Sequence, residues 1–144
     1  MSRSVLLETA NAVIESYNTW KPEALVAYRD PDCIHQILPA SLGRQPLNNE
    51  QYLAYFTPIM PAFKNFHVTV KHTVVDEEAR KVAMHASSTA TTDLGDYGNE
   101  YMLVLHMTVD GKKVVRFEEF VDSKYSTEFM PRLREHLVGK QKKA

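Results

Sequence analysis

The sequence contains little cysteine and little glycine, and it has no long apolar run. Its single cysteine, Cys33, excludes an internal disulfide. Its five glycines never cluster into a loop that could cradle phosphate groups, which argues against nucleotide chemistry. No apolar stretch matches a membrane span or the hydrophobic region of a signal peptide. These absences predict a cytoplasmic protein that has no membrane partner.

An excess of charge of one sign is also missing. The 17 Lys and Arg residues nearly balance the 18 Asp and Glu residues, so the field needed to hold nucleic acid is not expected. The chain has no Cys-x-x-Cys, no His-x-x-x-His and no carboxylate-rich loop of the EF-hand type. We therefore expect no metal, no organic cofactor and no nucleic-acid partner.

What is present is enough apolar sequence for one domain. The chain has 144 residues, of which 44% are hydrophobic, and a chain of this length can bury a substantial core. Nothing in residues 1–144 indicates a boundary, so we expect a single domain.

Helices are predicted mainly in the first half of the chain. Apolar residues recur at helical spacing over residues 3–18, which is typical of an amphipathic helix packed on one face. A proline suits the first turn of a second helix over residues 22–29, and a short strand follows over residues 33–38. Asn48 and Gln51 form a capping-box pattern at the start of a third helix.

From residue 65 onward the apolar period changes to two, which indicates strands. Strands are expected over residues 65–74, 82–92, 99–109 and 112–121. The last two should pair as a hairpin around Asp110-Gly111, and a closing helix over residues 123–138 should end at Gly139. This order predicts an α+β fold in which a strongly bent antiparallel sheet wraps around the N-terminal helices and leaves a conical pocket.

The hairpin carries ionisable groups on what should be its buried face. Alternation places Tyr97 and Tyr101 on the apolar face of one strand and Glu119 on that of the other. Burial of an unpaired carboxylate is costly, so this arrangement suggests a site in which Glu119 accepts and returns a proton. A structural pair with Arg29 is the alternative. The two phenols, four residues apart, are expected to reach opposite ends of a ligand.

Two histidines compete with Glu119 as the base. His72 is the one polar residue on an otherwise apolar strand face, and His35 lies on the short strand near the expected pocket mouth. Either side chain titrates near neutral pH, as a general base should. For each, a hydrogen-bonded core histidine is the alternative.

The outer face of the hairpin predicts a homodimer. The residues expected on this face form a mixed apolar surface: Met102, Val104, His106, Val114 and Phe120. An isologous contact would cover such a surface.

The order of these residues resembles a known family. The residues that carry the resemblance are Arg29 and Cys33-x-His35-x-x-Leu38-Pro39-x-Ser41-Leu42 early in the chain, and Tyr97-x-x-x-Tyr101 and Phe117-Glu118-Glu119-Phe120 late in it. They resemble the SnoaL-like branch of the nuclear transport factor 2-like superfamily. Within that branch the similarity is to fungal isomerases and cyclases of natural-product clusters, including meroterpenoid ring-rearranging enzymes and the brevianamide semipinacolase.

The resemblance implies a cofactor-independent acid/base isomerase or cyclase, usually dimeric, whose pocket folds a polycyclic small molecule. Residues in the positions of the semipinacolase's catalytic groups are Arg29, Tyr97, Tyr101 and Glu119. We expect Arg29 to hold a developing oxyanion and His72 to serve as a relay. Residues expected to contact the substrate are His35, Leu103, Phe117 and Met84. A dehydratase of the same fold and a non-catalytic dimer that binds a hydrophobic ligand remain alternatives.

Overall fold

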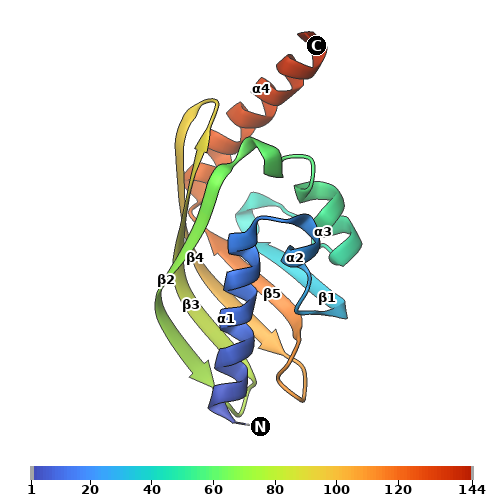
Figure 1. Cartoon of the computed structure of the whole chain (residues 1–144), viewed down its shortest axis with the longest axis vertical. Coiled ribbons are helices and arrows are strands. Elements are labelled where there is room, and N and C mark those ends of the chain that lie inside the picture. The colour runs from blue at the N-terminus through green and yellow to red at the C-terminus, as the bar shows by residue number, and fades with distance from the viewer. Residues whose placement is uncertain (1, 144) are drawn as a thin grey trace.

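One strongly curved sheet carries the fold, with helices on its concave face (Figure 1). The computed structural model describes residues 2–143. The helices are α1 (Arg3–Thr19), α2 (Pro22–Leu25), α3 (Asn49–Phe56) and α4 (Met130–Lys143), with short 3-10 turns η1 (Ala40–Leu42) and η2 (Met60–Ala62) and a π-helical turn η3 (Tyr125–Phe129). The strands are β1 (Arg29–Leu38), β2 (Lys64–Asp76), β3 (Lys81–Thr92), β4 (Gly95–Met107) and β5 (Val114–Val121).

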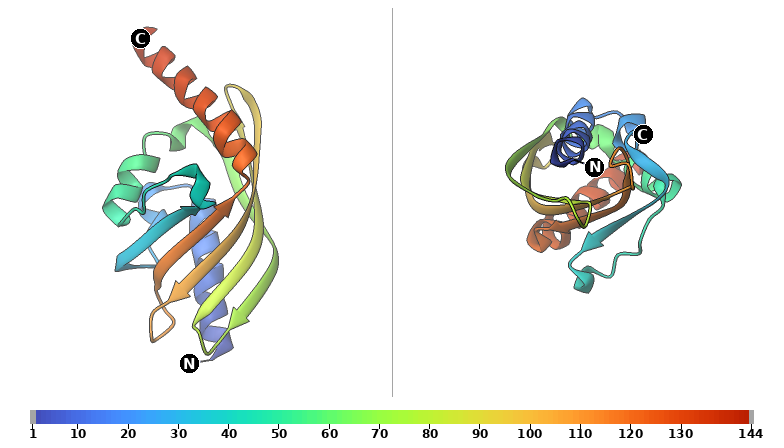
Figure 2. Two further views of the ribbon diagram at one scale, coloured as in Figure 1. Left: turned by 180° about the vertical axis from the view of Figure 1, so that it is seen from behind. Right: turned by 90° about the horizontal axis from the view of Figure 1, so that it is seen from below.

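The sheet has the order β1-β5-β4-β3-β2. The strands from β2 to β5 pair antiparallel, whereas β1 joins the edge of β5 in parallel. Seen from below in Figure 2, the sheet curves around α1. The α+β fold with a bent sheet around N-terminal helices is therefore as predicted. The parallel edge strand was not predicted, because the pattern of a short strand does not encode its direction.

The helix signals in the sequence act as expected at α1 and α3. The buried stripe of α1 includes Leu6, Ala10 and Val13 and packs on the inner side of β2 and β3. At α3 the capping box is present: Asn48 accepts from the Gln51 backbone N–H at 2.8 Å, and Gln51 accepts from that of Asn48 at 2.9 Å. Two helix-terminal donors are thereby satisfied.

The second helix is much shorter than predicted. It spans one turn, α2, and Arg29 already belongs to β1. The register of β1 breaks between Arg29 and Ile34, and Pro31 lies within this break. Because β1 is an edge strand, the missing N–H of Pro31 removes no bond to a second neighbour. Leu25 and Arg29 do not share a helix face, although both are buried.

The hairpin around Asp110-Gly111 is confirmed. The flanking strands pair antiparallel, and Gly111 has a φ of 75°, a value that favours glycine. The strands end at Met107 and restart at Val114, so the connection is longer than predicted. The Thr9 hydroxyl on α1 donates to the Gly111 carbonyl at 2.6 Å, which fixes this connection against the helix.

A β-bulge places His72 on the wrong side for its predicted role. The register of β2 breaks between Val70 and His72, so Lys71 is an extra residue. From this point the side-chain faces are reversed. The His72 ring is exposed and lies 5.8 Å from that of His85 on the outer face. The predicted place of His72 on the pocket face is therefore wrong.

A second bulge lies at the start of β5. His106 pairs with Arg116 and the next residue, Met107, with Val114, which leaves Val115 as the extra residue. Val114 is fully buried and Val115 is 37% exposed. Val114 was expected on the outer face, and this prediction is wrong because strict alternation does not reveal a bulge.

The C-terminal helix continues beyond its predicted end. Pro131 comes just after the π-helical turn η3, within a helical stretch that begins at Ser123, so the irregular turn lies where the proline lacks its N–H donor. Gly139 lies inside the helix rather than at its end, since α4 runs to Lys143. Beside it, His136 and Lys140 contact the Asp93 carboxylate at the β3–β4 turn, at 3.1 and 2.8 Å. The Lys140 contact lies past Gly139 and favours the additional turn. Within residues 2–143, the helices lack the length and apolar character of a membrane span.

Candidate active site

A cavity lies between the concave face of the sheet and the helices. It is lined mainly by aromatic and aliphatic side chains from every part of the chain, including Trp20, Phe56, Phe63, Phe66, Leu103 and Phe117. Glu119 is the one carboxylate among the described residues that line it. An apolar enclosure with few polar groups is the usual form of a small-molecule site. The polar groups therefore decide what this cavity can do.

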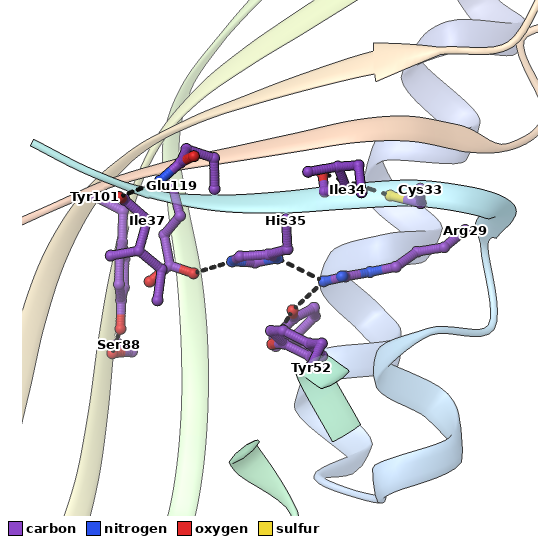
Figure 3. A network of polar contacts seen from close by, with 11 residues as sticks. Arg29, Cys33, Ile34, His35, Ile37, Tyr52, Ser88, Tyr101 and Glu119 are labelled. Carbon is purple, nitrogen blue, oxygen red and sulfur yellow. Dashed lines mark hydrogen bonds and ion pairs between the residues drawn. The ribbon is translucent and has the colours of Figure 1, made fainter. Parts of the chain in front are cut away.

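Glu119 stands at the end of a chain of polar contacts (Figure 3). Its Oε1 lies 2.9 Å from Nε2 of His35, and Nδ1 of the same ring lies 2.9 Å from Nη2 of Arg29. The Arg29 Nη2 also donates to the Tyr17 hydroxyl at 2.9 Å. The parallel pairing of β1 with β5 creates this chain, because it sets His35 beside Phe117 and Ile37 beside Glu119.

The contacts determine the tautomer of His35. A guanidinium only donates hydrogen bonds, so Nδ1 must accept from Arg29 through its lone pair. The ring proton is then on Nε2 and is donated to Glu119. A protonated ring would direct a second donor at Arg29. Burial lowers the pKa of His35, and the Arg29 charge lowers it further, although Glu119 opposes both. His35 is therefore a neutral donor that orients the carboxylate.

Arg29 is held behind the cavity wall. Its guanidinium carbon lies 4.2 Å from the centre of the Tyr52 ring and 4.8 Å from that of Phe117. Tyr17, Tyr52 and Phe117 line the cavity, whereas Arg29 does not. Arg29 was expected to bind a substrate oxygen directly, and its position behind the cavity wall does not support that role. Its Nε and Nη1 atoms are buried and have no hydrogen-bond partner among residues 2–143.

Two further phenols join this group. The hydroxyls of Tyr17 and Tyr52 lie 2.5 Å apart. Burial raises the pKa of Tyr17, and it raises that of Tyr52 well above the usual value. Both side chains therefore remain protonated at neutral pH. Because the Tyr17 oxygen accepts from Arg29, a permanent positive charge polarises a phenol in the cavity wall.

Tyr97 and Tyr101 line the cavity from β4, on the predicted face. The Tyr101 hydroxyl lies 2.7 Å from that of Ser88, and the Tyr97 hydroxyl accepts from the Asn99 amide at 2.9 Å. Burial raises the pKa of both tyrosines, and each hydroxyl affects the pKa of the other. Both phenols therefore remain protonated at neutral pH, and each hydroxyl is held by a different polar neighbour. That they reach opposite ends of a ligand stays a prediction.

The residues expected to contact the substrate divide into two pairs. Leu103 and Phe117 line the cavity. Met84 and His35 do not, because both are fully buried behind it. Met84 packs in the core between the sheet and α1. His35 is placed between the rings of Tyr52 and Phe117, at 4.6 and 4.5 Å between ring centres.

Several polar groups at the cavity were not predicted. They are Tyr17, Tyr52, Ser88, Asn99, Arg44 and Arg134. The helical spacing of Tyr17 and Tyr52 indicates only that they belong to apolar helix faces. The hydrogen bond between their hydroxyls depends on how the helices pack. Asn99 gave a signal that was overlooked, since it has the same strand parity as Tyr97 and Tyr101. Among residues 2–143, no three His, Cys, Asp or Glu side chains form a group that could hold a metal ion.

The chain is similar to known proteins in both sequence and fold. A model of the SnoaL-like polyketide cyclase family matches residues 7–128. The crystal structure of BvnE pinacolase from Penicillium brevicompactum superposes with a TM-score of 0.87 and 36% identity, covering 90% of this chain and 91% of that one.

Two relatives come from fungi. Austinoid biosynthesis clusters protein H of Penicillium brasilianum is 32% identical over 143 residues, which cover 96% of this chain and 97% of that protein. A protein of Cryptosporiopsis sp. (strain 8999) that is named a monooxygenase is 30% identical over 129 residues, with coverage of 88% and 86%. The names pinacolase and monooxygenase thus state different reactions.

Proposed function

The chain belongs to the SnoaL-like polyketide cyclase family, and we propose that it is an isomerase or cyclase that rearranges a polycyclic secondary metabolite without a cofactor. Similarity to an austinoid biosynthesis protein and to a pinacolase supports a fungal natural product as the substrate class. The observation that carries the proposal is the single carboxylate in an aromatic cavity, Glu119, oriented by a neutral histidine.

Glu119 is suited to move a proton between two positions of one substrate. Oε1 accepts the His35 hydrogen bond, and Glu119 lines the cavity, so we assign the second oxygen, Oε2, as the general base. Oε2 takes a proton from a C–H or O–H of the substrate, and the electron pair left behind forms or shifts a bond. The same carboxyl group then returns the proton elsewhere on the molecule. Atoms and charge balance without a further reactant, as an isomerisation requires.

The phenols stabilise the oxygen on which negative charge develops. Burial raises the pKa values of Tyr97 and Tyr101, so both remain O–H donors throughout the reaction. Ser88 and Asn99 hold their hydroxyls in place before the substrate binds. Donors fixed in an enclosed site stabilise developing charge more effectively than water does. Tyr17, polarised by Arg29, offers a third such hydroxyl.

The test compares Glu119 with its neighbour in sequence. Glu119→Gln keeps the size of the side chain and removes its basicity, so the rate should fall by about 10²–10⁴. Glu118→Gln is the matched control, because Glu118 lies on the outer face with His106 at 2.5 Å. The substrate is supplied as an extract of the producing organism after deletion of the gene, and products are followed by mass spectrometry. Turnover by a folded Glu119→Gln protein at the normal rate would contradict the proposal.

The mass of the product distinguishes the reaction classes. An isomerase or cyclase yields a product with the mass of its substrate. Loss of one water molecule would indicate a dehydratase. Gain of one oxygen atom would indicate a monooxygenase, the activity stated in the name of the Cryptosporiopsis relative. A ligand that binds without conversion would indicate a non-catalytic binding protein.

A further inference from the structure

Two arginines converge on one phenol at the cavity wall. Arg44, which follows η1, donates from Nη1 to the Tyr55 hydroxyl at 2.5 Å, and Arg134 on α4 donates to the same oxygen from Nη2. Their guanidinium carbons lie 5.8 and 4.5 Å from the centre of the Tyr55 ring. All three side chains are half-buried and line the same cavity as Glu119.

Neither arginine has an acidic partner within the described part of the chain. The ion pairs of residues 2–143 include neither Arg44 nor Arg134. A single neutral oxygen is the acceptor for both. Two like charges that share a partly desolvated position repel each other, and one phenol does not compensate them. The geometry thus leaves an excess of positive charge at this point of an otherwise apolar cavity.

We propose that Arg44 and Arg134 bind an oxyanion of the substrate, most simply a carboxylate, while its apolar body lies against the aromatic wall. Two planar guanidinium groups provide paired N–H donors that match the two oxygens of a carboxylate. Tyr55 holds both groups in position before the ligand arrives. This inference rests on the proposed function only for the polycyclic nature of the ligand. It narrows the substrate class to an acidic polycyclic compound.

The test uses a pair of probes that differ only in charge. Lithocholic acid has an apolar four-ring body and one carboxylate, and its methyl ester lacks the charge. Trp20, the one tryptophan of the chain, lines the cavity, so its fluorescence reports binding of either probe. Hydrogen bonds to a charged group predict that the acid binds roughly ten- to a hundredfold more tightly than the ester.

Variants identify the residues responsible. In the double variant Arg44→Met, Arg134→Met the preference for the acid should disappear, while the affinity for the ester stays the same. Each single variant should lose part of the preference, which allows a decision if the double variant does not fold. Arg132→Met is the matched control, because Arg132 lies on the same helix but is exposed and does not line the cavity.

The outcomes separate this inference from the proposed function. A wild-type protein that binds neither probe, or binds both equally, would overturn the inference, and so would a double variant that still prefers the acid. Binding is measured without turnover, so these results do not depend on Glu119. Conversely, loss of the acid preference in the arginine variants is informative even if Glu119→Gln leaves the rate unchanged.

Discussion

The Nη2 atom of Arg29 lies 2.9 Å from Nδ1 of His35, six residues further along the same strand. This contact connects a permanent charge behind the cavity to the carboxylate within it, because the other nitrogen of the ring donates to Glu119. Arg29 thus acts on the site through the tautomer that it imposes on His35. Variants of His35 and of Arg29 test the two contacts separately.

His35→Phe should slow the reaction without removing the base. The substitution keeps an aromatic ring between Tyr52 and Phe117 but deletes both hydrogen bonds. We expect a rate loss of roughly 10- to 100-fold, comparable to the loss of one charged hydrogen bond. The loss should appear in kcat, because the carboxylate is no longer held in position by a hydrogen bond. A purely structural role would lower the amount of folded protein and leave kcat per folded molecule unchanged.

The control for this variant is His85→Phe. The Nε2 of His85 lies 2.6 Å from the Glu100 carboxylate on the outer face, so His85, like His35, contacts a glutamate, but it does so outside the cavity. The rate of His85→Phe should match that of the wild type.

Arg29→Lys should lower kcat and change KM little. Lysine keeps the charge, but its ammonium ends one bond short of the position of Nη2, the single Arg29 nitrogen that contacts both Tyr17 and His35. The tautomer of His35 is then no longer imposed. Because Arg29 does not line the cavity, substrate affinity should remain within about twofold, on the scale of effects that surface contacts have. An increase in KM at constant kcat would instead indicate a direct contact between Arg29 and the substrate.

Much of the inner face of the hairpin follows from alternation alone. The pairing of β3 with β4 has no register break, so Tyr97 and Tyr101 lie on the face that the sequence indicates. Glu119 does so too, because the bulge in β5 lies earlier in that strand, at Val115. The predicted face of His72 is wrong because a bulge does precede it: one extra residue, Lys71, reverses the face of every residue after it.

The supporting residues of the site were beyond a local pattern. The contact of His35 with Glu119 depends on parallel pairing between strands that are 84 residues apart at these positions. The position of Arg29 behind the cavity depends on β1, which begins at the residue where a helix was expected to end. The convergence of Arg44 and Arg134 on Tyr55 joins a loop and two helices. Such contacts are properties of the assembled fold, and periodicity within one segment does not contain them.

The buried histidine makes stability depend on pH. The unfolded chain has the ordinary His pKa of 6.5, and burial lowers the pKa of His35 in the folded state. Between the two values the unfolded state binds more protons, so the free energy of unfolding should fall as the pH drops below about 6.5. One group contributes at most about 1.4 kcal/mol per pH unit.

The measurement is urea unfolding of the wild type and His35→Phe between about pH 7.5 and about pH 5. The difference in unfolding free energy between the two proteins should become smaller toward acid pH. Only the wild type has a ring that takes up a proton when the chain unfolds, so only its free energy of unfolding falls for this reason. A difference that is constant over this range would show that His35 is protonated equally in both states.

The last prediction concerns self-association. On the outer face, Met102 pairs with Phe120 across β4 and β5, and their side chains are 45% and 50% exposed. Val114, which was expected in the same patch, is buried and contributes nothing to it. We propose that this patch is the centre of an isologous homodimer, because adjacent large apolar side chains on the outer sheet face are costly to leave in water. Met102→Glu should then convert the dimer into a monomer at micromolar concentration, as measured by light scattering. Val109→Glu is the control, since Val109 is 78% exposed on the β4–β5 connection, away from the strands. A wild-type protein that is monomeric, or a Met102→Glu protein that remains dimeric, would place the contact elsewhere.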